Sequence, residues 1–153
     1  MEKQQKFQFS SPITGHVIDL SQVSDPVFSQ RMMGDGFAID PTEGKVVAPF
    51  DGFVEVLFPT GHAIGLSNGS GLNVLIHVGL NTFELKGKGF TIHTAQGAIV
   101  KKGDLLLEID IDAIKASGKT CITPIIFTDN QEIHCHKIGC DVTRNEDGLV
   151  SFL

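Results

Sequence analysis

The sequence has 153 residues and a mass of 16.5 kDa, the size of one ordinary domain. Hydrophobic residues make up 41% and charged residues 20%, a composition that excludes a disordered chain. The net charge of −6 and the pI of about 5.4 argue against a protein that binds nucleic acid or anionic lipid.

No apolar run approaches the ~20 residues that cross a bilayer. Residues 1–6 are polar and lead into no apolar signal segment. We therefore expect a cytoplasmic protein with no direct membrane insertion. We expect a flexible segment over residues 1–10 and a single domain over residues 11–153.

Turn-forming residues divide the chain into short apolar segments, because seventeen glycines and six prolines interrupt it. Only residues 25–33, where Phe28 and Met32 are four apart, and residues 112–117, before Gly118, have a helical pattern. The pattern predicts an all-β fold, an antiparallel β-sandwich or barrel with one or two very short helices. The expected strands cover residues 44–47, 52–58, 72–78, 98–100, 105–109 and 122–128.

A short motif occurs twice. Residues 11–17 and 48–54 both read small-Pro-x-x-Gly-x-Val, with an offset of 37 residues. Each copy has a proline that cannot donate to a strand ladder, then a glycine turn, then the start of a strand. The repeat indicates duplicated, hybrid-like β-motifs in one core.

Residues 62–77 have the pattern of a β-hairpin with its turn at Asn68-Gly69-Ser70-Gly71. If Gly69 and Ser70 form the tip, His62 lies directly opposite His77, with Cβ atoms roughly 4.5–5.5 Å apart. In this register Ile64, Leu66 and Leu75 share the face of the two histidines. Two adjacent imidazoles repel when both are protonated, so the pair favours a neutral ring, which is a nucleophile and a metal ligand.

Several segments resemble the glucose-type enzyme IIA domain of the bacterial phosphoenolpyruvate-dependent sugar phosphotransferase system. The resemblance covers residues 11–130 and is most specific around the two histidines. Its segments are residues 60–63 (TGHA), 75–80 (LIHVGL), 82–90 (TFELKGKGF), 25–28 (DPVF), 33–36 (MGDG), 41–44 (PTEG), 48–52 (APFDG) and 100–104 (VKKGD).

The resemblance implies a phosphohistidine carrier of sugar uptake. His77 would take the phosphoryl group on Nε2 from the phosphocarrier protein HPr and pass it to a cysteine of an enzyme IIB domain. His62 would steady that group, and Thr60 would set the tautomer of His62. The Gly79 carbonyl would orient the His77 ring. The partner-binding positions implied are Asp25, Phe28, Phe58, Val78, Gly79 and Asn81.

One position departs from the family pattern, because Asn81 stands where the family usually has an aspartate. The loss of this carboxylate predicts weaker attraction for arginines on a partner. The nucleophile and its stabilising histidine are unaffected. We therefore expect an active carrier.

Two alternatives have specific residues behind them. His134-Cys135-His136, followed by Cys140, is a pattern found in zinc peptidases of similar β architecture. The other alternative is a biotinyl or lipoyl carrier, but Lys86 and Lys88 stand in no Met-Lys-Met or Asp-Lys-Ala motif. We expect no required cofactor, although His62 and His77 could bind zinc with a further ligand from a partner.

Overall fold

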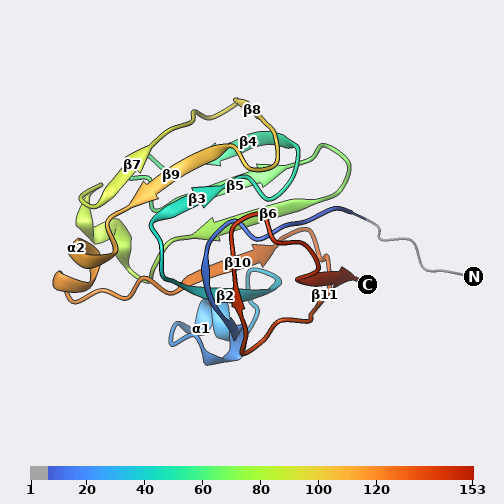
Figure 1. Cartoon of the computed structure of the whole chain (residues 1–153), viewed down its shortest axis with the longest axis horizontal. Coiled ribbons are helices and arrows are strands. Elements are labelled where there is room, and N and C mark those ends of the chain that lie inside the picture. The colour runs from blue at the N-terminus through green and yellow to red at the C-terminus, as the bar shows by residue number, and fades with distance from the viewer. Residues whose placement is uncertain (1–6) are drawn as a thin grey trace, which may run out of the picture.

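A computed structural model describes residues 7–153 of the chain (Figure 1). It has two short α-helices, α1 (Pro26–Ser29) and α2 (Ile111–Ala116), and two 3₁₀ turns, η1 (Leu20–Gln22) and η2 (Thr82–Leu85). The strands are β1 (Gly15–Asp19), β2 (Asp35–Pro41), β3 (Lys45–Val47), β4 (Gly52–Leu57), β5 (Ala63–Ser67), β6 (Asn73–His77), β7 (Phe90–Ile92), β8 (Ile99–Val100), β9 (Leu105–Ile109), β10 (Thr123–Phe127), β11 (Ile133–Cys135), β12 (Asp141–Val142) and β13 (Val150–Phe152). No helix in residues 7–153 has the length and hydropathy to span a membrane.

The main sheet is antiparallel and has the strand order β12-β1-β2-β10-β6-β5-β4-β8. Its halves mirror each other about the central β10–β6 pair, because β2 corresponds to β5, β1 to β4 and β12 to β8. Two smaller sheets, β3-β9-β7 and β11-β13, accompany these halves. The all-β antiparallel architecture confirms the predicted fold class.

The internal repeat is visible in the hydrogen bonds of the main chain. The two copies of the motif, residues 11–17 and 48–54, pair with each other near their starts. The first copy also pairs with residues 139–146, and the second copy pairs in the same way with residues 97–104. This correspondence supports a duplicated motif. The matched bonds run from Val47 N to Pro12 O and Ser10 N to Pro49 O, from Ala48 N to Asp104 O and Ser11 N to Glu146 O, and from Val54 N to Ala98 O and Val17 N to Cys140 O.

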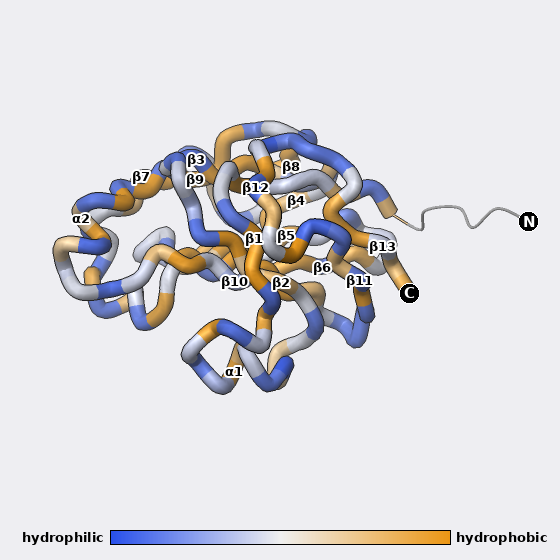
Figure 2. The backbone as a smooth tube through the Cα atoms, turned by 60° about the horizontal axis from the view of Figure 1, so that its bottom comes forward, coloured by the Kyte–Doolittle hydropathy of each residue, from blue (hydrophilic) through white to orange (hydrophobic). Residues whose placement is uncertain are grey.

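The large core lies between the main sheet and the two smaller sheets, and includes Phe37, Ile64, Leu106 and Phe127. A second cluster lies under η1 and α1, and contains Leu20, Phe28 and Ile126. Figure 2 shows the hydrophobic stretches along the central strands and the hydrophilic residues mainly in the connecting loops. The second cluster fixes α1 beside the central strands, close to the end of β6.

The six strands expected from the apolar segments are all present, with ends that shift by at most two residues. The first helix is shorter than expected, because α1 ends at Ser29 and Arg31 already has a φ of +57°. Met32 is 70% exposed and so shares no buried face with Phe28. The short α2 begins at its N-cap Asp110 and ends before Gly118, which has a φ of +88°.

The expected boundary at residue 10 needs correction. Phe9 is 6% exposed and Ser10 is fully buried, and the Ser10 N–H donates to the Pro49 carbonyl. Residues 7–10 therefore pack on the domain. Residues 1–6, the rest of the segment predicted to be flexible, lie outside the described residues.

The predicted register of the β5–β6 hairpin is wrong by one residue. Ala63 lies opposite His77, and Ile64 lies opposite Ile76. The turn is wider than the expected two-residue tip, because the Asn68 side chain accepts the N–H groups of Ser70 and Leu72. Of the three apolar residues assigned to the face of the histidines, only Leu75 alternates with His77 along β6. Ile64 and Leu66 belong to the large core instead.

Candidate functional site

The two histidines meet although the predicted register is wrong. His77 is the last residue of β6, and His62 directly precedes β5. Gly61, with a φ of +77°, turns the chain just before His62, so strict strand alternation does not govern the His62 side chain. The imidazole centroids lie 5.2 Å apart with ring planes at 78°. The Val78 N–H donates to the His62 carbonyl at 2.7 Å and ties the two segments together.

A backbone carbonyl sets the tautomer of His77. The Nδ1 atom of His77 lies 2.7 Å from the carbonyl oxygen of Gly79. A carbonyl oxygen only accepts, so Nδ1 carries the hydrogen and Nε2 keeps its lone pair. Gly79 has a φ of +75°, and a Cβ there would lie 2.5 Å from both Thr120 O and Thr82 Cγ2. Glycine is therefore required at this position for the turn that presents the carbonyl.

The hydroxyl of Thr60 forms a hydrogen bond with Nδ1 of His62, as the resemblance implied. When the hydroxyl donates, Nδ1 is the acceptor and Nε2 of His62 carries the proton. His62 then offers an N–H group beside the free lone pair of His77. The pair thus combines a nucleophile with a hydrogen-bond donor.

Burial lowers the pKa of both histidines from the usual value of 6.5. For His62, which is 6% exposed, the nearby His77 lowers the pKa further. For His77 the hydrogen bond to Gly79 and the negative charge of Asp25 oppose the effect of burial, which remains dominant. Both imidazoles are therefore neutral near pH 7.

Phenylalanine rings enclose the two imidazoles. Phe28 packs on His77 and Phe58 packs on His62, each with ring centroids 5.1 Å apart. Phe83 lies 6.3 Å from His62 and was not among the residues singled out from the sequence. The one feature of the sequence that could have indicated Phe83 is its position in the TFELKGKGF segment, residues 82–90. Phe58 and Phe83 are 40% and 52% exposed, so they form an apolar rim that a partner can cover.

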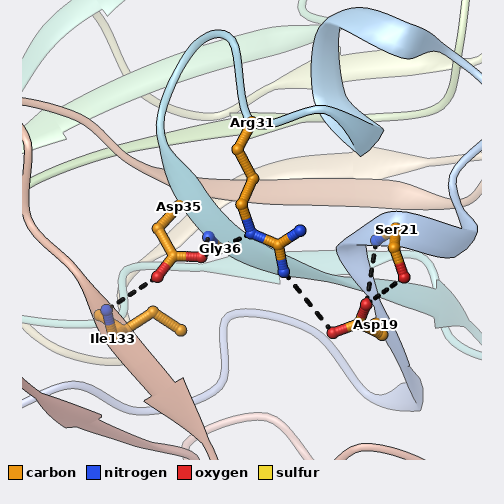
Figure 3. Close-up of polar contacts among 6 residues, drawn as sticks. All are labelled: Asp19, Ser21, Arg31, Asp35, Gly36 and Ile133. Atoms are coloured by element: carbon orange, nitrogen blue, oxygen red, sulfur yellow. Dashed lines mark hydrogen bonds and ion pairs between the residues drawn. The ribbon is translucent and has the colours of Figure 1, made fainter.

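Arg31 anchors the segment that carries Asp25 and Phe28 (Figure 3). Its Nε atom lies 3.0 Å from Asp35 Oδ1, and its Nη2 atom lies 3.7 Å from Asp19 Oδ1. The other Asp35 oxygen accepts the Ile133 N–H at 3.0 Å. Arg31 therefore links α1 to β1 and β2, and Asp35 extends the link to β11. This role was not predicted from the sequence, because Arg31 and Asp35 do not share a helix and the contacts with Asp19 and Ile133 join segments that are distant in sequence.

The structure separates the expected partner-binding positions into two groups. Asn81 and Phe58 are exposed, and Asp25, the N-cap of α1, is half-buried. Phe28 is 4% exposed, Val78 is fully buried and Gly79 is buried in the free domain, so direct partner contact of these three residues stays a prediction. Phe28 packs on His77, and Gly79 orients the His77 ring.

The metal alternatives are limited by the number of ligands. Within residues 7–153 no group of three or more His, Cys, Asp or Glu side chains could hold a metal ion. His62 and His77 could supply two nitrogen ligands, so a zinc ion there would need a ligand from a partner. The described residues give His134 and His136 no third ligand of the kind that a peptidase centre requires.

Comparisons with known proteins agree with the fold and the site. The family model described as phosphoenolpyruvate-dependent sugar phosphotransferase system, EIIA 1, matches residues 7–133. The solved structure of glucose permease IIA from Mycoplasma capricolum is 35% identical, with a TM-score of 0.87. That match covers 99% of this chain and 98% of the other.

The β-sandwich with two facing imidazoles defines a protein that carries a phosphoryl group on histidine. The chain belongs to the EIIA 1 family of the sugar phosphotransferase system. The zinc-peptidase and swinging-arm alternatives are not favoured.

Proposed function

We propose that His77 carries the phosphoryl group, which it takes from HPr and passes to a cysteine of an enzyme IIB domain in the cytoplasm. The observation that supports this assignment is the hydrogen bond from His77 Nδ1 to the Gly79 carbonyl. It leaves Nε2 with a free lone pair beside the His62 ring. A neutral imidazole in a fixed tautomer is a nucleophile that needs no proton transfer before it attacks.

In the first step Nε2 of His77 attacks the phosphorus atom of the donor in line with the bond that breaks. The lone pair of Nε2 forms the new N–P bond, and the electron pair of the old bond returns to the donor nitrogen. The hydrogen stays on Nδ1 and is donated to the Gly79 carbonyl, which stabilises the positive charge that develops on the ring. Asp25, whose charge raises the pKa of His77, acts in the same direction.

The Nε2–H group of His62 donates to a phosphoryl oxygen as the charge on the phosphoryl group rearranges. The hydroxyl of Thr60 holds the tautomer that makes this donation possible. Phe58 and Phe83 form the rim that excludes water once a partner is docked, which slows hydrolysis of the N–P bond.

In the second step a cysteine thiolate of the acceptor attacks the phosphorus atom. The N–P bond breaks, and its electron pair returns to Nε2 of His77. The histidine is then neutral again and ready for the next cycle. The net acidic charge of the chain suits donor and acceptor surfaces that carry arginine.

The experiment is intact-mass measurement of the protein after incubation with phosphoenolpyruvate, enzyme I and HPr. We expect a gain of about 80 Da, one phosphoryl group, that is labile in acid. His77→Gln should abolish the gain, because it removes the nucleophile. His134→Gln is the matched control, since it removes a histidine outside the site. Phosphorylation of His77→Gln at the wild-type rate would refute the assignment.

A further inference from the structure

A second pair of histidines, His134 in β11 and His136 directly after it, lies outside the site described above. His134 and His136 are both exposed, and their ring centroids are 4.8 Å apart with planes at 70°. Cys135 lies between them in the sequence and is part-buried in the large core. The two imidazoles therefore lie together at the surface of the β11–β13 sheet.

The other half of the duplicated fold has a different pair of side chains at the equivalent place. The His136 N–H donates to the Leu149 carbonyl, as the His93 N–H donates to the Leu106 carbonyl. At the equivalent place His93 Nε2 lies 2.8 Å from a carboxylate oxygen of Glu108. Ser151 takes the place of Glu108 beside His136, and its Oγ atom lies 2.5 Å from His136 Nε2.

The position of His134 is also informative. His134 lies opposite Ser151 across the β11–β13 pair, as Thr91 lies opposite Glu108 across the β7–β9 pair. One half of the fold thus holds a histidine–carboxylate pair at this location. The other half holds two imidazoles and a hydroxyl group.

We propose that His134 and His136 form a two-imidazole chelate for a divalent transition-metal ion of the zinc, nickel and copper class. Imidazole nitrogen is a preferred ligand of these ions, whereas Ca²⁺ and Mg²⁺ prefer oxygen. With metal–nitrogen bonds of about 2.0–2.1 Å, two imidazoles bound at angles of about 90–110° hold their ring centres about 4.5–5.2 Å apart. The 4.8 Å separation lies inside this interval.

Ser151 fits such a site as a positioning residue. A hydrogen bond from His136 Nε2–H to the Ser151 hydroxyl leaves the Nδ1 lone pair for the metal, and such contacts fix the tautomer of metal-binding histidines. Within residues 7–153 no third His, Cys, Asp or Glu completes the group, so water fills the remaining positions. The site binds a metal ion without the third protein ligand that a hydrolytic centre uses.

The test is calorimetric titration of the tag-free protein with ZnCl₂ or NiCl₂ alone, together with NMR. Ni²⁺ replaces Cu²⁺ because Cu²⁺ oxidises exposed thiols such as Cys140. The variants are His134→Asn, His136→Asn and the matched control His93→Asn. Sub-stoichiometric Ni²⁺ should perturb the amide signals of residues 133–136 and 151, which separates this site from any metal bound at His62 and His77.

We expect His134→Asn and His136→Asn each to weaken metal binding at this site by at least roughly tenfold, because the second ligand acts at high effective concentration. His93→Asn should leave the affinity unchanged. Unperturbed signals of β11 at millimolar Ni²⁺ would overturn the proposal. Equal affinity in wild type, His134→Asn and His136→Asn would overturn it as well. Neither outcome bears on the phosphorylation of His77, which is measured separately.

Discussion

The molecule contains two pairs of histidines with nearly the same internal geometry and very different surroundings. The ring centroids are 5.2 Å apart in the His62–His77 pair and 4.8 Å apart in the His134–His136 pair. The first pair packs against phenylalanines, whereas the second is exposed. Both have one ring in contact with a hydroxyl group, but among residues 7–153 only the first pair has a carbonyl that fixes the tautomer of the second ring.

This difference shows that the chemistry of a histidine pair depends on what surrounds it. Burial and the Gly79 carbonyl make His77 a neutral, oriented nucleophile. The exposed Phe58 and Phe83 lie against the neighbouring His62 ring, where a partner can cover them. An exposed pair with water around it has no means of protecting an N–P bond. Each imidazole of the His134–His136 pair has a nitrogen lone pair that can bind a metal ion.

The largest expected effect, after the loss of His77 itself, belongs to His62. His62→Gln should leave His77 able to accept a phosphoryl group but should slow transfer to the enzyme IIB domain by about 10²–10³-fold, because a preorganised donor is lost. The measurement is rapid-quench transfer from the phosphorylated protein to IIB. His136→Gln removes the corresponding ring of the exposed pair and should transfer at the wild-type rate. Equal rates for His62→Gln and wild type would show that His62 is only a packing residue.

The hydroxyl groups beside the two pairs provide the next comparison. Thr60→Val removes the contact with His62 Nδ1 and should slow onward transfer roughly tenfold, the cost of about one hydrogen bond. Thr60→Ser keeps the hydroxyl and should restore most of the rate. Ser151→Ala, next to His136, should leave the transfer rate unchanged. If Thr60→Ser is as slow as Thr60→Val, the hydroxyl does not set the tautomer.

Much of the fold could be predicted because the local signals agree with one another. Glycine and proline spacing with short apolar segments correctly predicted the all-β architecture, and residues 11–17 and 48–54 revealed the repeat. The strands of the second half, β11 to β13, were harder to predict. They contain no run of apolar residues like those that marked the equally short β3 and β8, and β12 is positioned by its pairing with β1 near the other end of the chain.

The candidate site was predicted for a partly wrong reason. The two-residue turn assumed for Gly69 and Ser70 placed His62 opposite His77, but the Asn68 side chain closes a wider loop. The rings still meet because Gly61 turns the chain before β5 begins. Such side-chain closure of a turn is not visible in the pattern of apolar residues, and neither is the contact of Arg31 with two aspartates.

A change at Asn81 should have a smaller effect on the rate of phosphorylation, and this effect should depend on the salt concentration. It is exposed in the left-handed conformation, with φ at 58° and ψ at 20°, which asparagine and aspartate tolerate better than most residues. Asn81→Asp should therefore fold normally and speed phosphorylation by HPr a few-fold at low salt, since a rim charge mainly changes the association rate. The gain should disappear at high salt because the attraction is screened. A rate that is independent of salt would contradict this view of Asn81.

The smallest effect concerns stability and follows from the lowered pKa values of His62 and His77. In the unfolded chain each imidazole has its usual pKa of about 6.5, and in the folded protein burial lowers it. At pH values between the folded-state and unfolded-state pKa, the unfolded chain binds more protons than the folded protein. The stability that the neutral histidines contribute is therefore complete above about pH 6.5 and is lost as the pH falls toward the lowered pKa. Urea unfolding at about pH 7.5 and about pH 5.5 measures it. The double variant His62→Gln/His77→Gln should lose less stability over this interval than wild type. An equal loss in both proteins would mean that the buried pair is not what makes folding sensitive to acid in this range.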